Sequence, residues 1–189
     1  LLVHKKNGER RFCLDLRRLN SVTKLRSYPL PTMEDVLDVV AEQRPTLFTS
    51  LDLSSGYWQS KLDPSTADRT GFQTDSGSYI FQRTPFGLCG AVQFFQEVMQ
   101  KVLRGLTPST ALIYLDDVMI LAKNPSDMET KLQQVFDRFR AANLRIHPSK
   151  CHWSVSRVKF LGYVFDENGI SVDGTKLDIV RNFHRPKSP

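Results

Sequence analysis

The chain has 189 residues, of which 40% are hydrophobic, and it carries a formal net charge of +6 at neutral pH. This length suffices to bury a core in one or two domains, and the apolar content, with twelve phenylalanines, excludes a disordered chain. The longest apolar stretch is interrupted by two aspartates, so no segment is suited to span a bilayer. Three scattered cysteines are typical of a reducing compartment. Because the first residue is Leu1 and no secretory signal pattern follows it, we expect a piece of a longer intracellular polypeptide.

The excess positive charge is concentrated in the first 26 residues. Eight lysines and arginines stand there against two acids, and this difference of six equals the net charge of the whole chain. A basic stretch of this kind is typical of contact with phosphates. A solvated basic surface is an equally reasonable interpretation, and the composition does not separate the two.

A β-hairpin is predicted at the N-terminus. The dipeptide Asn7-Gly8 is a strong turn signal and separates two runs that have the character of strands. In the second run Arg11, Asp15 and Arg17 fall on one face by alternation. Asp15 is therefore expected to brace arginines on a polar face.

A helix and a strand are predicted next. Thr32 is a suitable N-cap for a helix that Pro45 ends, and the apolar run that follows is a strand ending at Asp52. A further hairpin is predicted to turn at residues 75–77.

Two more helices are predicted next. A hairpin separates them, and another hairpin follows the second helix. The first helix should end with Gly105 as its C-cap, and its apolar stripe is predicted to consist of Phe94, Phe95, Val98, Met99, Val102 and Leu103. The second helix is predicted to begin with a capping box of Ser126 and Glu129. A last turn is expected at Asn168-Gly169. The mixture of helices and hairpins favours an α+β fold with an antiparallel sheet.

The most informative feature of the sequence is the acid pair Asp116-Asp117 between the apolar runs 111–115 and 118–122. Adjacent carboxylates raise each other's pKa, and the nearest basic residue in sequence is Lys123. Acid pairs also occur in ordinary turns, but the apolar flanks and the matching Asp52 at the end of another strand favour a metal site. If these strands pair in one sheet, three carboxylates converge, which suits Mg²⁺. Two such ions can support an in-line displacement at phosphate.

Six motifs cover essentially the whole chain and read KKNG with the following basic run, FTSLDLSSGYWQ, TPFGLCGAVQFFQEVM, YLDD, LRIHPSKC and FLGYVFDENGI. In this order they resemble the motifs of the reverse transcriptases of gypsy-type LTR retrotransposons and, more distantly, those of retroviruses. The family usually has Asn and Pro where this chain has Gly90 and Val92. The missing proline is expected to loosen the start of the following helix and to weaken activity, whereas the three acids are intact.

This resemblance implies a palm-and-fingers polymerase fold, in which helices back an antiparallel palm sheet. It assigns residues 1–25 and 60–90 to the fingers, 26–59 and 91–170 to the palm, and 171–189 to the start of a thumb or linker. In the parent polyprotein it implies flanking ribonuclease H, protease and integrase domains, and a location in cytoplasmic virus-like particles.

The resemblance also implies the activity of an RNA-directed DNA polymerase, which extends a primer with deoxynucleoside triphosphates on an RNA or DNA template. The catalytic acids Asp52, Asp116 and Asp117 would bind two Mg²⁺ ions, for which Mn²⁺ could substitute. The substrate-binding residues implied by the resemblance are Lys5, Lys6 and Arg11 at the triphosphate, Tyr57 as a gate against a 2′-hydroxyl, and Phe86 and Gly87 along the nucleotide pocket. Lys150 is a possible proton donor to pyrophosphate, with an ordinary surface lysine as the alternative.

Two other functions remain open at this stage. A nucleic-acid-binding protein that keeps the polymerase fold without turnover would fit Gly90 and Val92, but the intact acids oppose it. An RNA-dependent RNA polymerase shares the acid constellation, but it would not place the bulky Tyr57 against a ribose.

Overall fold

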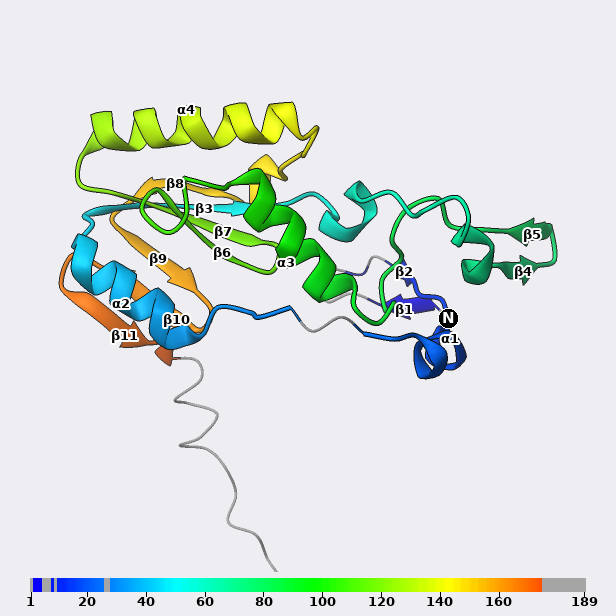
Figure 1. The fold of residues 1–189 in the computed structure, drawn as a ribbon. Helices are drawn as coiled ribbons and strands as arrows, with labels where there is room; N and C mark the ends of the chain where they lie inside the picture. Colours follow the sequence, from blue (N-terminus) through cyan, green and yellow to red (C-terminus); the bar gives the residue numbers. More distant parts are fainter. Residues whose placement is uncertain (1, 5–7, 9, 26–27, 175–189) are drawn as a thin grey trace, which may run out of the picture.

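The structure is a computed structural model that describes residues 2–4, 8, 10–25 and 28–174. Helices and antiparallel strands are mixed along the chain (Figure 1), which confirms the predicted α+β class. In these described ranges, no helix combines the length and the apolar character needed to cross a membrane.

A four-stranded antiparallel sheet forms the centre of the molecule. Its strands lie in the order β6-β7-β3-β8, and they comprise β3 (Leu47–Asp52), β6 (Ala111–Tyr114), β7 (Asp117–Ala122) and β8 (His152–Val155). This spatial order places the strand that ends at Asp52 directly beside the strand that begins at Asp117. The predicted pairing of the Asp52 strand with the acidic hairpin is confirmed.

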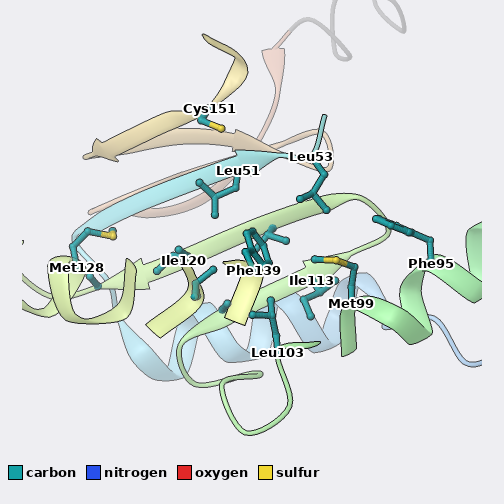
Figure 2. Packing of buried hydrophobic residues seen from close by; sticks show 14 residues of the cluster. Leu51, Leu53, Phe95, Met99, Leu103, Ile113, Ile120, Met128, Phe139 and Cys151 are labelled. Atoms are coloured by element: carbon teal, nitrogen blue, oxygen red, sulfur yellow. The ribbon is translucent and has the colours of Figure 1, made fainter. Parts of the chain in front are cut away.

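Both faces of this sheet are buried, which explains why β7 is apolar from Val118 to Ala122 and why even Thr49 of β3 is fully buried. On one face lie α3 (Ala91–Val102) and α4 (Pro125–Ala141), and Figure 2 shows Phe95, Met99 and Phe139 of these helices gathered against the strands. The alternation of β3 directs Leu51 to this cluster and Phe48 to the opposite one.

The opposite face is covered by α2 (Met33–Gln43) and by a three-stranded sheet in the order β11-β10-β9. The strands of this second sheet are β9 (Arg157–Phe160), β10 (Tyr163–Asp166) and β11 (Gly169–Val172). The predicted turn before Gly169 is confirmed. A second turn at residues 161–162, where both residues have positive φ angles, divides the segment into two hairpins.

The remaining elements lie at the end of the molecule away from α2 (Figure 1). They are β1 (Leu2–His4), β2 (Arg10–Phe12), α1 (Arg17–Val22), the 3₁₀ turns η1 (Gly56–Gln59) and η2 (Ala67–Thr70), and the hairpin β4 (Phe72–Thr74) and β5 (Gly77–Tyr79). A further 3₁₀ turn, η3 (Pro148–Lys150), precedes β8. Both predicted hairpins are confirmed, and the rings of Phe12 and Phe72, 5.2 Å apart, join them.

The N-terminal hairpin is shorter than its sequence pattern suggested. Strand β2 ends at Phe12 and Arg17 already begins α1, so the strand alternation does not continue to Arg17. Asp15 instead accepts hydrogen bonds from the backbone and the guanidinium of Arg17 at the start of that helix. These contacts hold the pKa of Asp15 down, at about 2.

Helix α2 begins as predicted. Thr32 is its N-cap, and Thr32 and Asp35 form a reciprocal capping box that satisfies two backbone N–H groups. The predicted capping box of α4 is wrong. The backbone N–H of Asp127 donates to Asn124 Oδ1 at 2.9 Å, because Asn124 is extended and Pro125 starts the helix, which places Ser126 inside the first turn.

Helix α3 also departs from its sequence pattern. Its last residue is Val102 and Leu103 is the C-cap, so Gly105 lies beyond the helix end. Phe94, predicted to be in the buried stripe, is 47% exposed. The helical period turns Phe94 away from the face that Phe95 and Met99 share.

Candidate active site

The register of β3 against β7 brings two of the three predicted acids together. Asp52 is the last residue of β3 and Asp117 the first of β7, and their Cα atoms are directly opposed. Opposed residues of antiparallel strands project from the same face, with Cβ atoms about 4.5–5.5 Å apart. The two carboxylates therefore share one end of the central sheet.

Asp116 lies in the two-residue turn that connects β6 to β7. The preceding residue, Leu115, has a positive φ of 60°, and its backbone N–H donates to Oε1 of the fully buried Gln96 at 2.6 Å. The turn also packs against η1, where a Cβ on Gly56 would lie 3.1 Å from the ring of Phe95 and 3.4 Å from Asp116 Cβ. A side chain at this position would have to displace the ring of Phe95 by a few tenths of an ångström, so glycine suits this close approach.

The three acids act on one another electrostatically. Burial, reinforced by the charges of Asp116 and Asp52, raises the pKa of Asp117 to about 6. Asp52 Oδ1 is buried and accepts no hydrogen bond in the described part of the chain. The ammonium of Lys150 lies 3.5 Å from this oxygen. An oxygen that accepts no hydrogen bond, next to carboxylates that repel one another, fits a divalent cation with hard oxygen ligands.

The acids are nevertheless not closed around a common point. Among the described residues, no group of three or more His, Cys, Asp or Glu side chains is arranged to hold a metal ion. Asp52 and Asp117 are opposed across the sheet, whereas Asp116 belongs to the turn beside them. A cation would therefore draw the third carboxylate in rather than enter a completed cage.

Two predicted nucleotide-binding residues meet beside the acids. The ring of Tyr57 in η1 lies edge-on to Phe86 and to Phe95, with centroids 5.5 Å apart in both pairs. Burial and the charge of Asp116 raise the pKa of Tyr57, so the phenol stays protonated near the carboxylates. Tyr57 is thus half-buried, with its ring against Phe86 and Phe95.

The loop that carries Phe86 and Gly87 is held by α1. Asn20 Nδ2 donates to the carbonyl of Gly87 at 2.9 Å, and Asn20 Oδ1 accepts from the backbone N–H of Cys89 at 2.8 Å. Gly87 and Gly90 have φ angles of 88° and 80°, in a region that favours glycine. Gly90 is the N-cap of α3, so the helix starts at Ala91 without the family's proline.

Lys150 lies close to one of the three acids, Asp52. Its Nζ is 3.5 Å from Asp52 Oδ1. The approach is fixed by backbone pairing, because His147 N–H donates to the carbonyl of Asp52 at 2.8 Å and Leu53 bridges to Ile146. Cys151 completes the contact, since its sulfur accepts from the backbone N–H of Asp52.

The predicted triphosphate ligands are not placed by the structure. Lys5 and Lys6 lie outside the described residues, and Arg11 is described only by its backbone, opposite Val3 in the N-terminal hairpin. Sequence reasoning, in turn, assigned no role to Gln96. It lies in the same helix as Phe95 and Met99, and no local signal links it to the turn of the acids.

Solved structures with the same architecture are viral reverse transcriptases. A foamy viral protease-reverse transcriptase in complex with double-stranded DNA superposes with a TM-score of 0.88 at 22% identity, covering 98% of this chain and 32% of that one. The same enzyme in complex with an RNA/DNA hybrid gives a TM-score of 0.84 at 22% identity, over 98% and 24%. The fold is thus the palm-and-fingers polymerase fold that the motifs predicted.

Residues 3–165 match the family described as reverse transcriptase (RNA-dependent DNA polymerase), and the chain belongs to this family. It is 37% identical to the retrovirus-related Pol polyprotein from transposon 412 of Drosophila melanogaster, over 98% of this chain and 15% of that protein. The Pol polyprotein from transposon gypsy of the same species is 32% identical, over 95% and 17%. The Tf2-3 polyprotein of Schizosaccharomyces pombe is 31% identical, over 100% and 14%.

These matches confirm the predicted relationship to retrotransposon reverse transcriptases. The chain spans between 14% and 17% of the length of these three relatives. Reverse transcriptases generally use divalent metal ions, in agreement with the chemistry of the three acids.

Proposed function

We propose that this chain is the polymerase centre of a reverse transcriptase, and that it extends a primer with deoxynucleotides on an RNA or DNA template. The observation that carries the proposal is the opposition of Asp52 and Asp117 at one end of the sheet, with Asp116 in the adjoining turn. Family membership supports it. The foamy viral relatives are described in complex with double-stranded DNA and with an RNA/DNA hybrid.

In this proposal Asp52, Asp116 and Asp117 are the ligands of two Mg²⁺ ions, with Mn²⁺ as a substitute. Such ions would activate the primer 3′-hydroxyl and stabilise the leaving pyrophosphate. The protein's own contribution is to hold acceptor oxygens at the sheet end. One of them is the buried Asp52 Oδ1, which accepts no hydrogen bond from the described residues and lies 3.5 Å from the ammonium of Lys150.

The nucleotide would lie between these acids and the aromatic pair. The ring of Tyr57, supported by Phe86 and Phe95, would exclude a 2′-hydroxyl by steric clash, and Gly87 would line the same pocket. Lys5, Lys6 and Arg11 would neutralise the triphosphate, and Lys150, near Asp52, would donate a proton to pyrophosphate. We further propose that ribonuclease H, protease and integrase domains flank this segment in its parent, because its relatives are Pol polyproteins.

Primer extension with Mg²⁺ on RNA and DNA templates tests the activity. The doubly substituted variant Asp116→Ala/Asp117→Ala should lose extension, whereas Asp137→Ala, an exposed acid on α4 that pairs with Arg140, should keep it. Duplex binding by the unsubstituted chain without any extension would instead support a binding protein that retains the fold.

The sugar gate has its own test. Tyr57→Ala should raise incorporation of ribonucleotides relative to deoxynucleotides, and Tyr79→Ala, a 47% exposed tyrosine in the β4–β5 hairpin, should not. If the two variants discriminate equally between ribonucleotides and deoxynucleotides, Tyr57 is not the sugar gate. Efficient ribonucleotide incorporation by the unsubstituted chain would favour an RNA polymerase.

A further inference from the structure

A cavity of about 600 Å³ lies close to the candidate active site, between η1 and the loop that follows α4. These segments are far apart in the sequence but adjacent in the fold (Figure 1). The cavity is lined by Trp58, Gln59, Lys61, Arg83, Ala142, Asn143 and Arg145. None of the residues assigned to catalysis above is among them.

The lining is strongly basic. Lys61, Arg83 and Arg145 are all exposed, and no acidic residue lines the cavity in the described part of the chain. None of the three side chains has an ion-pair partner among the described residues. Three cations on one concave surface repel one another, and an anion bound there would relieve that repulsion.

Gln59 forms hydrogen bonds to two of the three basic residues, Arg145 and Arg83. Its side chain is bonded in both directions to the backbone of Arg145, since Nε2 donates to the carbonyl at 2.8 Å and Oε1 accepts from the N–H at 2.7 Å. Its own carbonyl accepts from Arg83 Nη1 at 2.9 Å. One residue thus positions two arginines, and the guanidinium of Arg83 keeps further N–H donors for a ligand.

The third cation is fixed by the backbone. Lys61 forms a β-bridge with Arg83, and the flanking bonds from Leu62 N–H to the carbonyl of Gln82 and from Thr84 N–H to the carbonyl of Ser60 extend it. The backbone that carries the three basic side chains is therefore held in place by hydrogen bonds.

An aromatic face completes the cavity. Trp58 is 43% exposed, and its ring lies edge-on to Phe86 with centroids 5.4 Å apart. Phe86 in turn contacts Tyr57, so a single aromatic residue separates this cavity from the proposed sugar gate. An exposed indole beside cations is the usual means of stacking a base while its phosphates are neutralised.

We propose that this cavity is a docking site for nucleoside polyphosphates, outside the reacting position. Trp58 stacks on the base, Lys61, Arg83 and Arg145 bind the polyphosphate, and Gln59 positions the two arginines. The cavity volume is that of a small-molecule site, and it fits a single nucleotide. The binding assignment stands on the cavity alone, whereas its use as a waiting position for incoming nucleotides rests on the proposed function.

Tryptophan fluorescence provides a direct test. The chain has two tryptophans, so Trp153→Phe leaves Trp58 as the only indole. In EDTA, without primer or metal, ATP should quench this fluorescence saturably, and inorganic tripolyphosphate should compete. Arg83→Gln and Arg145→Gln in the same background should each weaken ATP binding by about tenfold, as expected for the loss of one charge-assisted contact, and Gln59→Leu should weaken it as well.

The control is Arg157→Gln, which replaces an exposed arginine on β9 that pairs with Asp166, and it should leave ATP binding unchanged. The variant Asp116→Asn/Asp117→Asn should also keep binding, which separates this site from the polymerase centre. Thermal unfolding of each variant checks that the fold is intact. The proposal is overturned if Arg83→Gln and Arg145→Gln bind ATP normally, or if they lose only the binding of a single-stranded oligonucleotide. Because the assay needs no turnover, an inactive polymerase would not affect its outcome.

Discussion

Gln96 accepts a hydrogen bond of 2.6 Å from the backbone N–H of Leu115, the residue that precedes the acid pair. Gln96 is completely buried in α3, and Leu115 adopts a positive φ of 60°, an uncommon conformation for a large side chain. The bond therefore offsets part of the cost of that conformation and ties the turn of Asp116 to the helix behind it.

Replacing Gln96 by methionine should loosen this turn. Methionine keeps the length of the side chain but leaves the Leu115 N–H without its acceptor, which costs about 1–3 kcal/mol for a buried donor. We expect urea unfolding to show a loss within this range, and primer extension to fall further than the loss of folded protein explains. Gln133→Met on the exposed face of α4, where only a side-chain bond to Asp137 is lost, should change neither measurement appreciably. Equal behaviour of the two variants would contradict the proposed role of Gln96.

The raised pKa of Asp117 predicts how stability depends on pH in the absence of metal. A carboxyl with a pKa of about 6 in the folded chain, against an unfolded value near 3.8, binds its proton more tightly when folded. The folded state is therefore favoured below pH 4, and its stability declines as pH rises through 6.

Asp117→Asn should remove this decline. In EDTA at pH 7.5 the variant should be more stable than the unsubstituted chain, by about 1 kcal/mol, because solvent access to Asp117 screens much of the full shift. The difference should vanish below pH 4. Asp137→Asn, an exposed acid with its own arginine partner, serves as the control in urea unfolding at several pH values. A difference in stability between the Asp117→Asn variant and the parent chain that does not change with pH would refute this electrostatic account.

The N-cap of α4 is Asn124, not Ser126 as the sequence pattern suggested. Asn124 accepts the hydrogen bond from Asp127 N–H, so Asn124→Ala should destabilise the chain by about 1 kcal/mol. Ser126→Ala should have little effect, because its position within the first turn makes it dispensable for capping. Thermal unfolding of both variants checks this, and a larger loss for Ser126→Ala would restore the cap that the sequence suggested.

Asp52 and the acid pair could be predicted because the signal for each is local. A strand-like apolar run that ends in an acid, and a hairpin with acids between apolar runs, are both visible within a dozen residues. Once β3 and β7 pair, register alone opposes Asp52 and Asp117. The α+β class followed from the same local patterns.

The supporting residues could not be predicted, because their partners are distant in sequence. Gln59 bonds to Arg145, 86 residues away, and Asn20 bonds to Gly87, 67 residues away. A polar side chain gives no sign of such a partner in its own segment. The missed cap of α4 has a different cause, since Ser126 matches the capping-box pattern while Asn124, two residues earlier, meets the geometric requirement.

A single substitution of Lys150 can separate a role in proton transfer from a role in an ion pair with Asp52. Its ammonium lies 3.5 Å from Asp52 Oδ1, and 59% of its side chain is exposed. An exposed ion pair contributes at most about 1 kcal/mol to stability, so Lys150→Gln should unfold almost like the parent chain. If Lys150 donates a proton to the leaving pyrophosphate, the same variant should slow single-turnover extension by about a hundredfold or more. Lys159→Gln is the matched control, because Lys159 lies in the second sheet and forms a similar ion pair with Asp173. Extension at the parent rate by Lys150→Gln would leave Lys150 as a surface lysine that merely pairs with Asp52.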